Sequence, residues 1–292
     1  MVELVHAPRE LATATDALRA QGLRVGLVPT MGALHDGHMS LVNAVRAAGA
    51  TRVVLSVFVN PLQFGPKEDF SKYPRTLDSD LALCEKHGVD LVYAPSPEQM
   101  YPTGFQTHVA VERITQPLEG AARPTHFRGV TTVVAKLFNA TGPCVAAFGR
   151  KDYQQWRTLE RMVKDLDMPV RVLGCPIMRE VDGLAMSSRN RYLGPDERAR
   201  ATAIYAGLHA ASTAFQRGER RVTTLEALAR EPIAAAFSSI DYITIAGAED
   251  LEAPGALASD SSVMLVAARL GATRLIDNAV LGQDCLGQAA VR

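Results

Sequence analysis

The sequence predicts an α/β fold, with a Rossmann-like doubly wound parallel sheet followed by a smaller α+β C-terminal domain. Strand-like and helix-like runs alternate up to about residue 175. One of these runs, RVVLSVFV at 52–59, is apolar almost throughout, as in a parallel strand buried on both faces. After about residue 176 the order changes, and helix-like stretches are followed by strand-like runs.

The elements of the first domain follow from the spacing of apolar residues. The N-terminal stretch predicts a short strand and a helix. Further strands are expected at 24–30, 52–59, 90–95, 144–149 and 169–175, and helices at 40–50, 76–88, 130–140 and 152–166. The segment 96–129 is rich in Pro, Gly, Arg and His. It predicts a long irregular stretch, and such stretches in compact domains usually line a site.

The second domain is predicted from helix-like segments around 196–217 and 222–237, followed by strand-like runs at 241–247, 262–270 and 273–281. Helices and strands that are grouped in this way favour an α+β arrangement. We therefore expect a first domain at 1–177 and a smaller C-terminal domain at 178–292.

Composition narrows the class of protein. The chain has 292 residues, 47% of them hydrophobic, and its 31 basic and 31 acidic residues cancel. A neutral chain argues against a nucleic-acid partner, whose phosphates usually require a basic face. No apolar run approaches the ~18 residues of a membrane span, and the N-terminus does not have the pattern of a signal peptide. The four cysteines (Cys84, Cys144, Cys175, Cys285) form no CxxC pair, which predicts reduced thiols and a cytoplasmic enzyme.

The stretch PTMGALHDGH at 29–38 lies between a predicted strand and a predicted helix. In a doubly wound sheet ligands bind at the carboxyl ends of strands, where helix N-termini present N–H groups to phosphates. His35 and His38 are three residues apart, so a helix start places both rings on one side. Two imidazoles there can donate hydrogen bonds to phosphate oxygens. Capping of the helix and zinc ligation are the other interpretations, although the neighbouring sequence completes no obvious zinc ligand set.

The stretch VFVNPLQFGPKEDFSKYPRT at 57–76 begins where the apolar strand ends. The amides of Asn60 and Gln63 could bind hydroxyl and carboxylate groups of a small substrate at this strand end. The polar segment 65–72 carries charges of both signs. It is equally consistent with a mobile lid over a site and with an ordinary solvated loop.

A third stretch, FGRKDYQQ at 148–155, passes from a strand to a helix. Lys151 at this turn is a candidate phosphate ligand, because its ammonium is a mobile point charge, although surface lysines are common. Capping of the helix explains Asp152 equally well.

The fourth stretch is REVDGLAMSSRNRYL at 179–193. Ser187, Ser188 and Arg189 lie near the expected domain boundary. Small hydroxyls beside an arginine suit a triphosphate clamp, and the same string suits a polar hinge.

The motifs recur in a fixed order along nearly the whole chain: PTMGALHDGH, FVNPLQF, YPRT, HFRGVTTVVAKLFN, FGRKDYQQ, GLAMSSRNRYL and TRLIDN. In that order and spacing they resemble the pantoate–β-alanine ligase family, within the HIGH-motif nucleotidylyltransferase superfamily. The resemblance implies that pantoate and ATP form pantoyl adenylate and pyrophosphate, and that β-alanine then displaces AMP to give pantothenate. It also implies Mg²⁺ with ATP, a homodimer, and a C-terminal domain that forms a lid over the ATP site of the nucleotide- and pantoate-binding first domain.

The resemblance assigns roles to individual residues. His35, His38 and Lys151 would be catalytic: the histidines would bind the ATP phosphates, one also acting as proton donor, and the lysine would hold phosphate oxygens. The implied ATP-binding set is Thr30, Met31, Gly32, His35, His38, Gly149, Lys151, Asp152, Met178, Met186, Ser187, Ser188 and Arg189. The implied set for pantoate or β-alanine is Gln63, Gln155, Asn60, Tyr73 and His126, and no residue is assigned to a protein metal site.

The sequence departs from the family pattern at Thr125, where glycine is common, and at Cys144, where aspartate is common. Neither position belongs to the implied phosphate contacts. Three other classes share part of the pattern. They are a nucleotidylyltransferase that transfers AMP or CMP to a phosphate-bearing acceptor, a class I aminoacyl-tRNA synthetase, and a non-catalytic nucleotide-binding protein. The first class is not expected to share both FVNPLQF and FGRKDYQQ. The second is disfavoured by the short, charge-neutral chain without an obvious tRNA-binding domain, and the third by the intact basic and imidazole positions.

Overall fold

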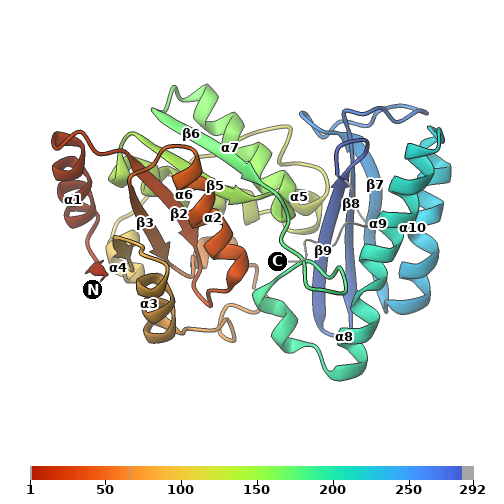
Figure 1. Ribbon diagram of the computed structural model, residues 1–292, viewed down its shortest axis with the longest axis horizontal. Helices are drawn as coiled ribbons and strands as arrows, with labels where there is room; N and C mark the ends of the chain where they lie inside the picture. Colours follow the sequence, from red (N-terminus) through yellow and green to blue (C-terminus); the bar gives the residue numbers. More distant parts are fainter. Residues whose placement is uncertain (1, 67, 285–292) are drawn as a thin grey trace. The chain divides into compact units, whose positions relative to one another are not determined.

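The structure is a computed structural model that describes residues 2–66 and 68–284. The chain forms two compact units (Figure 1). Unit 1 consists of Met1–Arg150 and Gln154–Pro176, and unit 2 of Lys151–Tyr153 and Ile177–Arg292. The short piece Lys151–Tyr153 belongs with unit 2 although the residues on either side of it belong to unit 1. A division by chain position alone cannot reveal such an exchange.

Unit 1 is built on a six-stranded sheet in the order β1-β4-β3-β2-β5-β6. Every pairing in it is parallel. The strands are β1 (Glu3–Val5), β2 (Val25–Thr30), β3 (Arg52–Val57), β4 (Leu91–Tyr93), β5 (Cys144–Gly149) and β6 (Val170–Cys175). The strand order reverses between β2 and β5, which makes this pair the topological switch point where open α/β sheets bind ligands. The predicted doubly wound parallel sheet is confirmed.

Helices cover both faces of this sheet (Figure 1). The helices are α1 (Pro8–Ala20), α2 (Asp36–Ala47), α3 (Leu77–Lys86), α4 (Pro97–Met100), α5 (Glu119–Ala122), α6 (His126–Thr141) and α7 (Tyr153–Asp165), with short 3₁₀ turns η1 (Pro61–Gln63) and η2 (Arg150–Asp152). Leu11 of α1, Val134 of α6 and Leu159 of α7 share one buried core cluster. Val42 of α2 and Cys84 of α3 belong to a second one. Burial of apolar side chains on both faces explains why β3 reads as a continuous apolar run.

Two helices begin earlier than the apolar spacing predicts. Helix α2 begins at Asp36, because His35 is its N-cap and the motif itself forms the first turn. Helix α6 begins at His126 and is buried on nearly all sides, so its start carries no amphipathic signal. The segment 96–129 is therefore less irregular than predicted. It also contains α5 and α4, the latter capped by Ser96 with Pro97 as its first residue.

Unit 2 has the predicted α+β composition. Its elements are η3 (Ser188–Tyr192), α8 (Pro195–Ala201), α9 (Ala203–Gln216), α10 (Val222–Ala236), β7 (Ser239–Gly247), β8 (Ser262–Leu270) and β9 (Thr273–Val280). The strands form an antiparallel sheet in the order β7-β8-β9. Leu208, Leu225 and Ile233 of the helices share one core with Met264 and Ala279 of the sheet. The helix predicted at 196–217 is two helices, because α8 ends at Ala201 and Thr202 separates it from α9.

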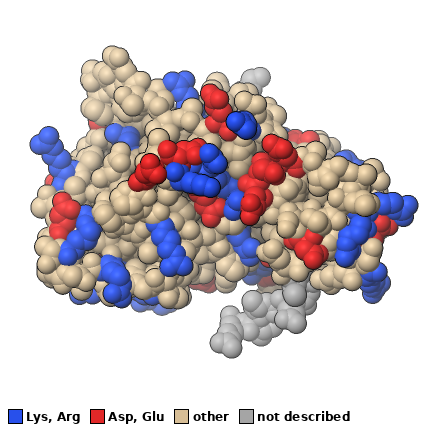
Figure 2. Space-filling view, turned by 90° about the horizontal axis from the view of Figure 1, so that it is seen from above, with Lys and Arg blue, Asp and Glu red and all other residues tan. Residues whose placement is uncertain are grey.

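Among the described residues, no helix has both the length and the apolar character that crossing a bilayer would require. On the face drawn in Figure 2, acidic and basic side chains are interspersed, in keeping with their equal numbers. The described cysteines, Cys84, Cys144 and Cys175, are free thiols. Burial raises the pKa of the Cys84 and Cys144 thiols to about 12, so both are protonated at neutral pH. Cys285 lies outside the described residues.

Candidate active site

The histidine turn, Thr30–His38, connects β2 to α2 at the switch point of the sheet. The Thr30 hydroxyl donates to the Ser56 carbonyl oxygen at 2.6 Å and accepts from the Gly32 N–H at 3.1 Å. Gly32 and Ala33 then both take positive φ, at 81° and 51°, which reverses the chain before the helix begins. The conformation suits glycine but is disfavoured for alanine, because Ala33 carries a Cβ.

The two histidine rings lie together, with centroids 4.2 Å apart. His35 Nδ1 accepts a hydrogen bond from the Gly37 N–H at 3.2 Å. His38 Nδ1 accepts one from the His35 N–H at 3.3 Å. A backbone N–H can only donate, so each Nδ1 is unprotonated and each neutral ring carries its proton on Nε2. The turn therefore fixes two imidazoles as Nε2–H donors.

The electrostatics of the turn set the charge of one ring. Burial, with a smaller contribution from the neighbouring His35 ring, lowers the pKa of His38 to about 3. His38 is therefore neutral at physiological pH. It can donate a hydrogen bond to a phosphate oxygen, but it does not carry the extra proton of an imidazolium acid.

The amide loop, which we define as Asn60–Tyr73, follows β3; its Lys67 lies outside the described residues. Asn60 is 1% exposed, and its side chain makes four hydrogen bonds within unit 1. Its Nδ2 donates to the Gln63 Oε1 and to the Gly129 carbonyl. Its Oδ1 accepts from the Leu62 N–H and the Tyr101 hydroxyl. These four bonds use the full hydrogen-bonding capacity of the side-chain amide, so Asn60 stabilises the conformation of the amide loop.

Gln63 connects the amide loop to the histidine turn. Its Nε2 donates to the Met31 Sδ at 2.9 Å. A thioether sulfur is a weak acceptor, so a substrate hydroxyl or carboxylate oxygen would be a stronger partner for the same N–H. The backbone carbonyl oxygen of Gln63 accepts from Arg123 Nη2 at 3.2 Å and from His126 Nδ1 at 3.0 Å. The backbone of Gln63 is thus fixed while its side chain amide can change partner.

His126 and Arg123 support the loop from α6 and the segment before it. His126 is 8% exposed, and because its acceptor is a carbonyl, its Nδ1 carries the proton. Burial and the charge of Arg123 lower the pKa of His126 to about 4, so the ring is neutral. Arg123 forms a bidentate ion pair with Glu68, with Nε to Oε1 at 2.5 Å and Nη2 to Oε2 at 2.7 Å. A direct contact of His126 with substrate stays a prediction.

Three other residues of the predicted site lie in unit 1. Tyr73 is buried, with its ring centroid 6.0 Å from that of Phe64. Gly149 ends β5, and a Cβ added there would meet no atom within 4 Å, so a ligand can approach its backbone. Gln155 is half-buried in the first turn of α7. Its neighbour Gln154 is buried, donates to the Ile114 and Pro117 carbonyls, and accepts from the Glu119 N–H.

The remaining predicted ATP contacts lie in unit 2, where the first group surrounds Lys151. The carbonyl oxygen of Lys151 accepts a hydrogen bond from Asn278 Nδ2 of β9 at 2.9 Å. The Tyr153 hydroxyl donates to the Ala248 carbonyl at 2.9 Å. Both contacts hold the piece Lys151–Tyr153 within unit 2, and Asp152 is exposed between them.

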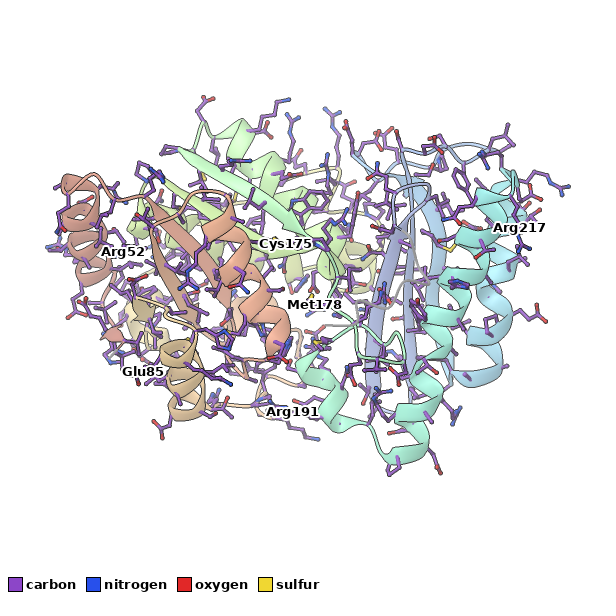
Figure 3. All side chains as sticks on the ribbon, in the orientation of Figure 1. Arg52, Glu85, Cys175, Met178, Arg191 and Arg217 are labelled. Carbon is purple, nitrogen blue, oxygen red and sulfur yellow. The ribbon has the colours of Figure 1, made fainter. Side chains whose placement is uncertain are left out.

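The second group is a hairpin closed by the bridge between Arg179 and Ala185, together with the 3₁₀ turn η3 that follows it. Figure 3 labels Met178 at the start of the hairpin and Arg191 in η3. The Met186 N–H donates to the Met178 carbonyl at 2.9 Å. The Ser187 hydroxyl oxygen then caps η3 by accepting from the Arg189 N–H at 3.3 Å, and Ser188 is its first residue. The backbone of the predicted triphosphate segment is thus organised by local hydrogen bonds.

Sequence reasoning assigned no role to several residues that hold these segments. Asp277 of β9 is buried and binds Arg179 of the hairpin through two hydrogen bonds, at 2.6 Å and 3.1 Å. Its neighbour Asn278 holds Lys151. The signal was an acid and an amide side by side between the apolar pairs of the strand-like run TRLIDNAVL, because polar residues buried in a strand need partners. Asp80 and Gln154 were missed as well.

Two histidines at this spacing could also bind zinc. Among residues 2–66 and 68–284, no group of three or more His, Cys, Asp and Glu side chains is arranged to hold a metal ion.

An open parallel sheet with a histidine-bearing strand-to-helix turn at its switch point defines an α/β nucleotide-binding protein. The sequence profile of the family described as pantoate-beta-alanine ligase matches residues 3–280. The chain belongs to this family.

Relatives extend over nearly the whole chain. Pantothenate synthetase of Chloroherpeton thalassium is 50% identical over 280 residues, covering 95% of this chain and 98% of that protein. The Geobacter sulfurreducens pantothenate synthetase is 52% identical over 271 residues, covering 91% and 94%. The crystal structure of pantothenate synthetase from Thermus thermophilus has a TM-score of 0.89 at 45% identity, covering 96% of this chain and 99% of that one.

A further solved structure is the pantoate-β-alanine ligase of Francisella tularensis, described as complexed with β,γ ATP and β-alanine. Its TM-score is 0.79 at 30% identity, and it covers 97% of this chain and 99% of that one. The resemblance found in the sequence, and the ligase class that it implied, are confirmed by these comparisons. The roles of individual residues stay predictions.

Proposed function

We propose that this chain condenses pantoate with β-alanine, using ATP, by way of pantoyl adenylate, and releases AMP and pyrophosphate. One observation carries the proposal beyond family membership. The histidine turn presents two neighbouring imidazoles, each fixed as an Nε2–H donor by a backbone hydrogen bond to its Nδ1. Fixed donors at a strand-to-helix turn suit a phosphate group that gains charge during transfer.

In the first step a carboxylate oxygen of pantoate attacks the α-phosphorus of ATP, and the bond to pyrophosphate breaks. His35 and His38 donate to phosphate oxygens as charge develops on them. Lys151 and Ser187–Arg189 of unit 2 hold the triphosphate. Thr30, Met31, Gly32, Gly149, Asp152, Met178 and Met186 complete the proposed ATP contacts. The step joins two anions, so positioned donors and cations are the main contribution that the protein can make.

Pantoate is held by Gln63 and Gln155 through its hydroxyls and carboxylate. The Gln63 side chain supports this role, because its amide N–H donates to the weak thioether acceptor of Met31 and would gain a stronger acceptor when pantoate binds. Asn60 and His126 keep the Gln63 loop in place.

In the second step the amine of β-alanine attacks the acyl carbonyl of the adenylate. The carbon–oxygen bond to AMP breaks, and the amine loses a proton. A carboxylate resists such attack, whereas an acyl phosphate has a good leaving group. The donors that stabilised the first transition state also stabilise the departing phosphate of AMP. Tyr73 lies on the amide loop, and we propose it for the β-alanine side of the site.

Mg²⁺ is expected with ATP, because the leaving pyrophosphate is polyanionic. The described residues build no protein cage for such an ion, so we propose that the phosphates of ATP carry it. We further propose that the chain acts as a homodimer in the cytoplasm, that residues 1–177 and 178–292 act as two domains, and that the second serves as a lid over the ATP site.

The proposal is tested with purified protein, ATP, magnesium and each substrate in turn. AMP and pyrophosphate should form only when pantoate is present, and pantothenate only when β-alanine is added. Pantoate alone should support exchange of labelled pyrophosphate into ATP, which reports the adenylate directly. ATP turnover that ignores pantoate, or that yields ADP, would refute the reaction.

A further inference from the structure

We propose that Asp80 is a positioning residue for the phosphate-binding histidines, acting through the backbone of the histidine turn rather than by contact with substrate. The inference rests on the proposed function of His35 and His38. Neither the motifs nor the family resemblance drew attention to this carboxylate. Its contacts are all made within unit 1.

Asp80 lies in the first turns of α3 and is 2% exposed. Its Oδ2 accepts from the Ala33 N–H at 3.0 Å and from the Thr76 hydroxyl at 3.1 Å. Its Oδ1 accepts from the Leu34 N–H at 2.9 Å. The carboxylate therefore receives two successive backbone N–H groups of the histidine turn, one on each oxygen.

This arrangement explains the backbone conformation of the turn. Ala33 has φ +51°, in the left-handed region that residues with a Cβ rarely adopt. It follows Gly32, whose φ is also positive, and successive N–H groups in such a turn converge on an anion. Here the anion is the protein's own carboxylate. Its position near the N-terminus of α3 further favours the negative charge.

The position of the Ala33–Leu34 backbone also determines where the two histidine rings lie. His35 follows Leu34 directly, takes an extended conformation and caps α2. Its N–H is the donor that fixes Nδ1 of His38. A displacement at Ala33 or Leu34 therefore moves the cap of α2 and the hydrogen bond that sets the His38 tautomer. Displacements of about 1 Å in a catalytic group can cost on the order of 10²-fold in rate.

The first experiment compares Asp80→Asn with Asp78→Asn. Asp78 also lies in the first turn of α3, but it is exposed, so it controls for charge at that helix end. Asp80→Asn places an amide N–H against backbone donors. It should lower kcat for pantoate-dependent AMP formation by about 10- to 100-fold while the KM for pantoate changes little. Asp78→Asn should leave both unchanged.

A readout independent of activity is the ¹⁵N NMR spectrum of the histidine rings. The wild-type protein and Asp78→Asn should show His38 with Nδ1 unprotonated and Nε2 protonated. Asp80→Asn should show a mixture of tautomers. An Asp80→Asn variant with the wild-type His38 spectrum and wild-type kcat would overturn the positioning role.

A rescue separates positioning from direct action on the substrate. Glycine adopts positive φ without strain, so adding Ala33→Gly to Asp80→Asn should restore part of the lost kcat. A lack of recovery, or a raised magnesium requirement in Asp80→Asn, would mean that the carboxylate acts on the nucleotide or its metal and would overturn the proposal. Where Asp80→Asn does not fold, Thr76→Val removes one donor and keeps the carboxylate. It should give a smaller fall in kcat with KM unchanged, and an unchanged kcat would overturn the proposal.

Failure of this inference is distinguishable from failure of the proposed function. A wild-type protein that forms no AMP with pantoate would refute the function, while the ring spectra of the two variants would still test Asp80. An active wild-type protein whose Asp80→Asn and Asp78→Asn variants behave alike would refute the positioning role alone.

Discussion

The histidine turn and the amide loop leave neighbouring parallel strands at the same edge of the sheet, yet they are held by different interactions. The turn is held by backbone N–H groups that donate to a buried carboxylate and to neutral imidazoles. The loop is held by side chains: the Asn60 amide and the Glu68–Arg123 ion pair. Strands β2 and β3 pair along their whole length, so the sheet itself does not cause the difference.

In the proposed mechanism, two segments at one edge of the sheet thus serve two functions: one fixes hydrogen-bond donors, and the other binds a substrate. Donors that stabilise a transition state must be fixed before the reaction begins, and backbone hydrogen bonds provide that. A loop that binds a small acid can depend on side chains, since Gln63 must exchange one partner for another. We therefore expect changes in the turn to affect rate, and changes in the loop to affect substrate binding and stability.

The largest expected effect belongs to His38→Ala in the turn. Loss of one transition-state donor typically costs ~10²–10³ in rate, so kcat for pantoate-dependent pyrophosphate release should fall by that order. Gln63→Ala in the loop is the matched change, and it should mainly raise the KM for pantoate. Steady-state kinetics on both variants, with thermal unfolding to show that they fold, would check this. A kcat effect confined to Gln63→Ala would reverse the assignment of the two segments.

An intermediate effect is expected from Glu68→Gln, through the pH dependence of stability. Burial raises the pKa of Glu68, but the hydrogen bond and charge of Arg123, together with smaller contributions that include the Gly65 N–H, hold the pKa below its ordinary value. A lowered folded-state pKa gives stability that is present above the unfolded-state value of about 4.3 and is lost as pH falls through the folded-state value.

Urea unfolding from pH 7 downward measures this contribution. The wild-type protein should lose free energy of unfolding more steeply below about pH 4.3 than Glu68→Gln does, because the variant has no carboxylate to protonate. At pH 7 the variant should be the less stable of the two. Parallel curves for the two proteins would show that the ion pair contributes little to holding the loop.

The smallest effect is expected from Thr125→Gly, which places glycine where the sequence resemblance implies it. Thr125 is the N-cap of α6, with φ −96° and no side-chain capping bond. The backbone there does not require glycine, and glycine at an N-cap costs only a few tenths of a kcal/mol relative to the preferred capping residues. We expect kcat to be unchanged and the melting temperature to shift only slightly. A large gain in activity would show that Thr125 disturbs the His126 segment.

Much of the fold could be predicted from sequence because its signals are local. The apolar run of β3 and the alternation of strands and helices are direct consequences of burial on a parallel sheet. The start of α2 was misplaced because the PTMG–HxGH stretch has no apolar period, and capping by His35 decides where that helix begins. The exchange of Lys151–Tyr153 into unit 2 has no local signal, since it depends on Asn278, 127 residues further along the chain.

The sequence by itself determined the α/β class, the family and the segments that carry the candidate site, because short motifs and the spacing of apolar residues are local properties of the chain. The tertiary structure decided which groups hold those segments. Only the fold brings Asp80 to the N–H groups of Ala33 and Leu34, which lie 47 and 46 residues away in the chain. Only the fold turns two histidines into Nε2–H donors of defined tautomer. A buried polar group must find a partner, and which partner it finds depends on the elements that folding places beside it.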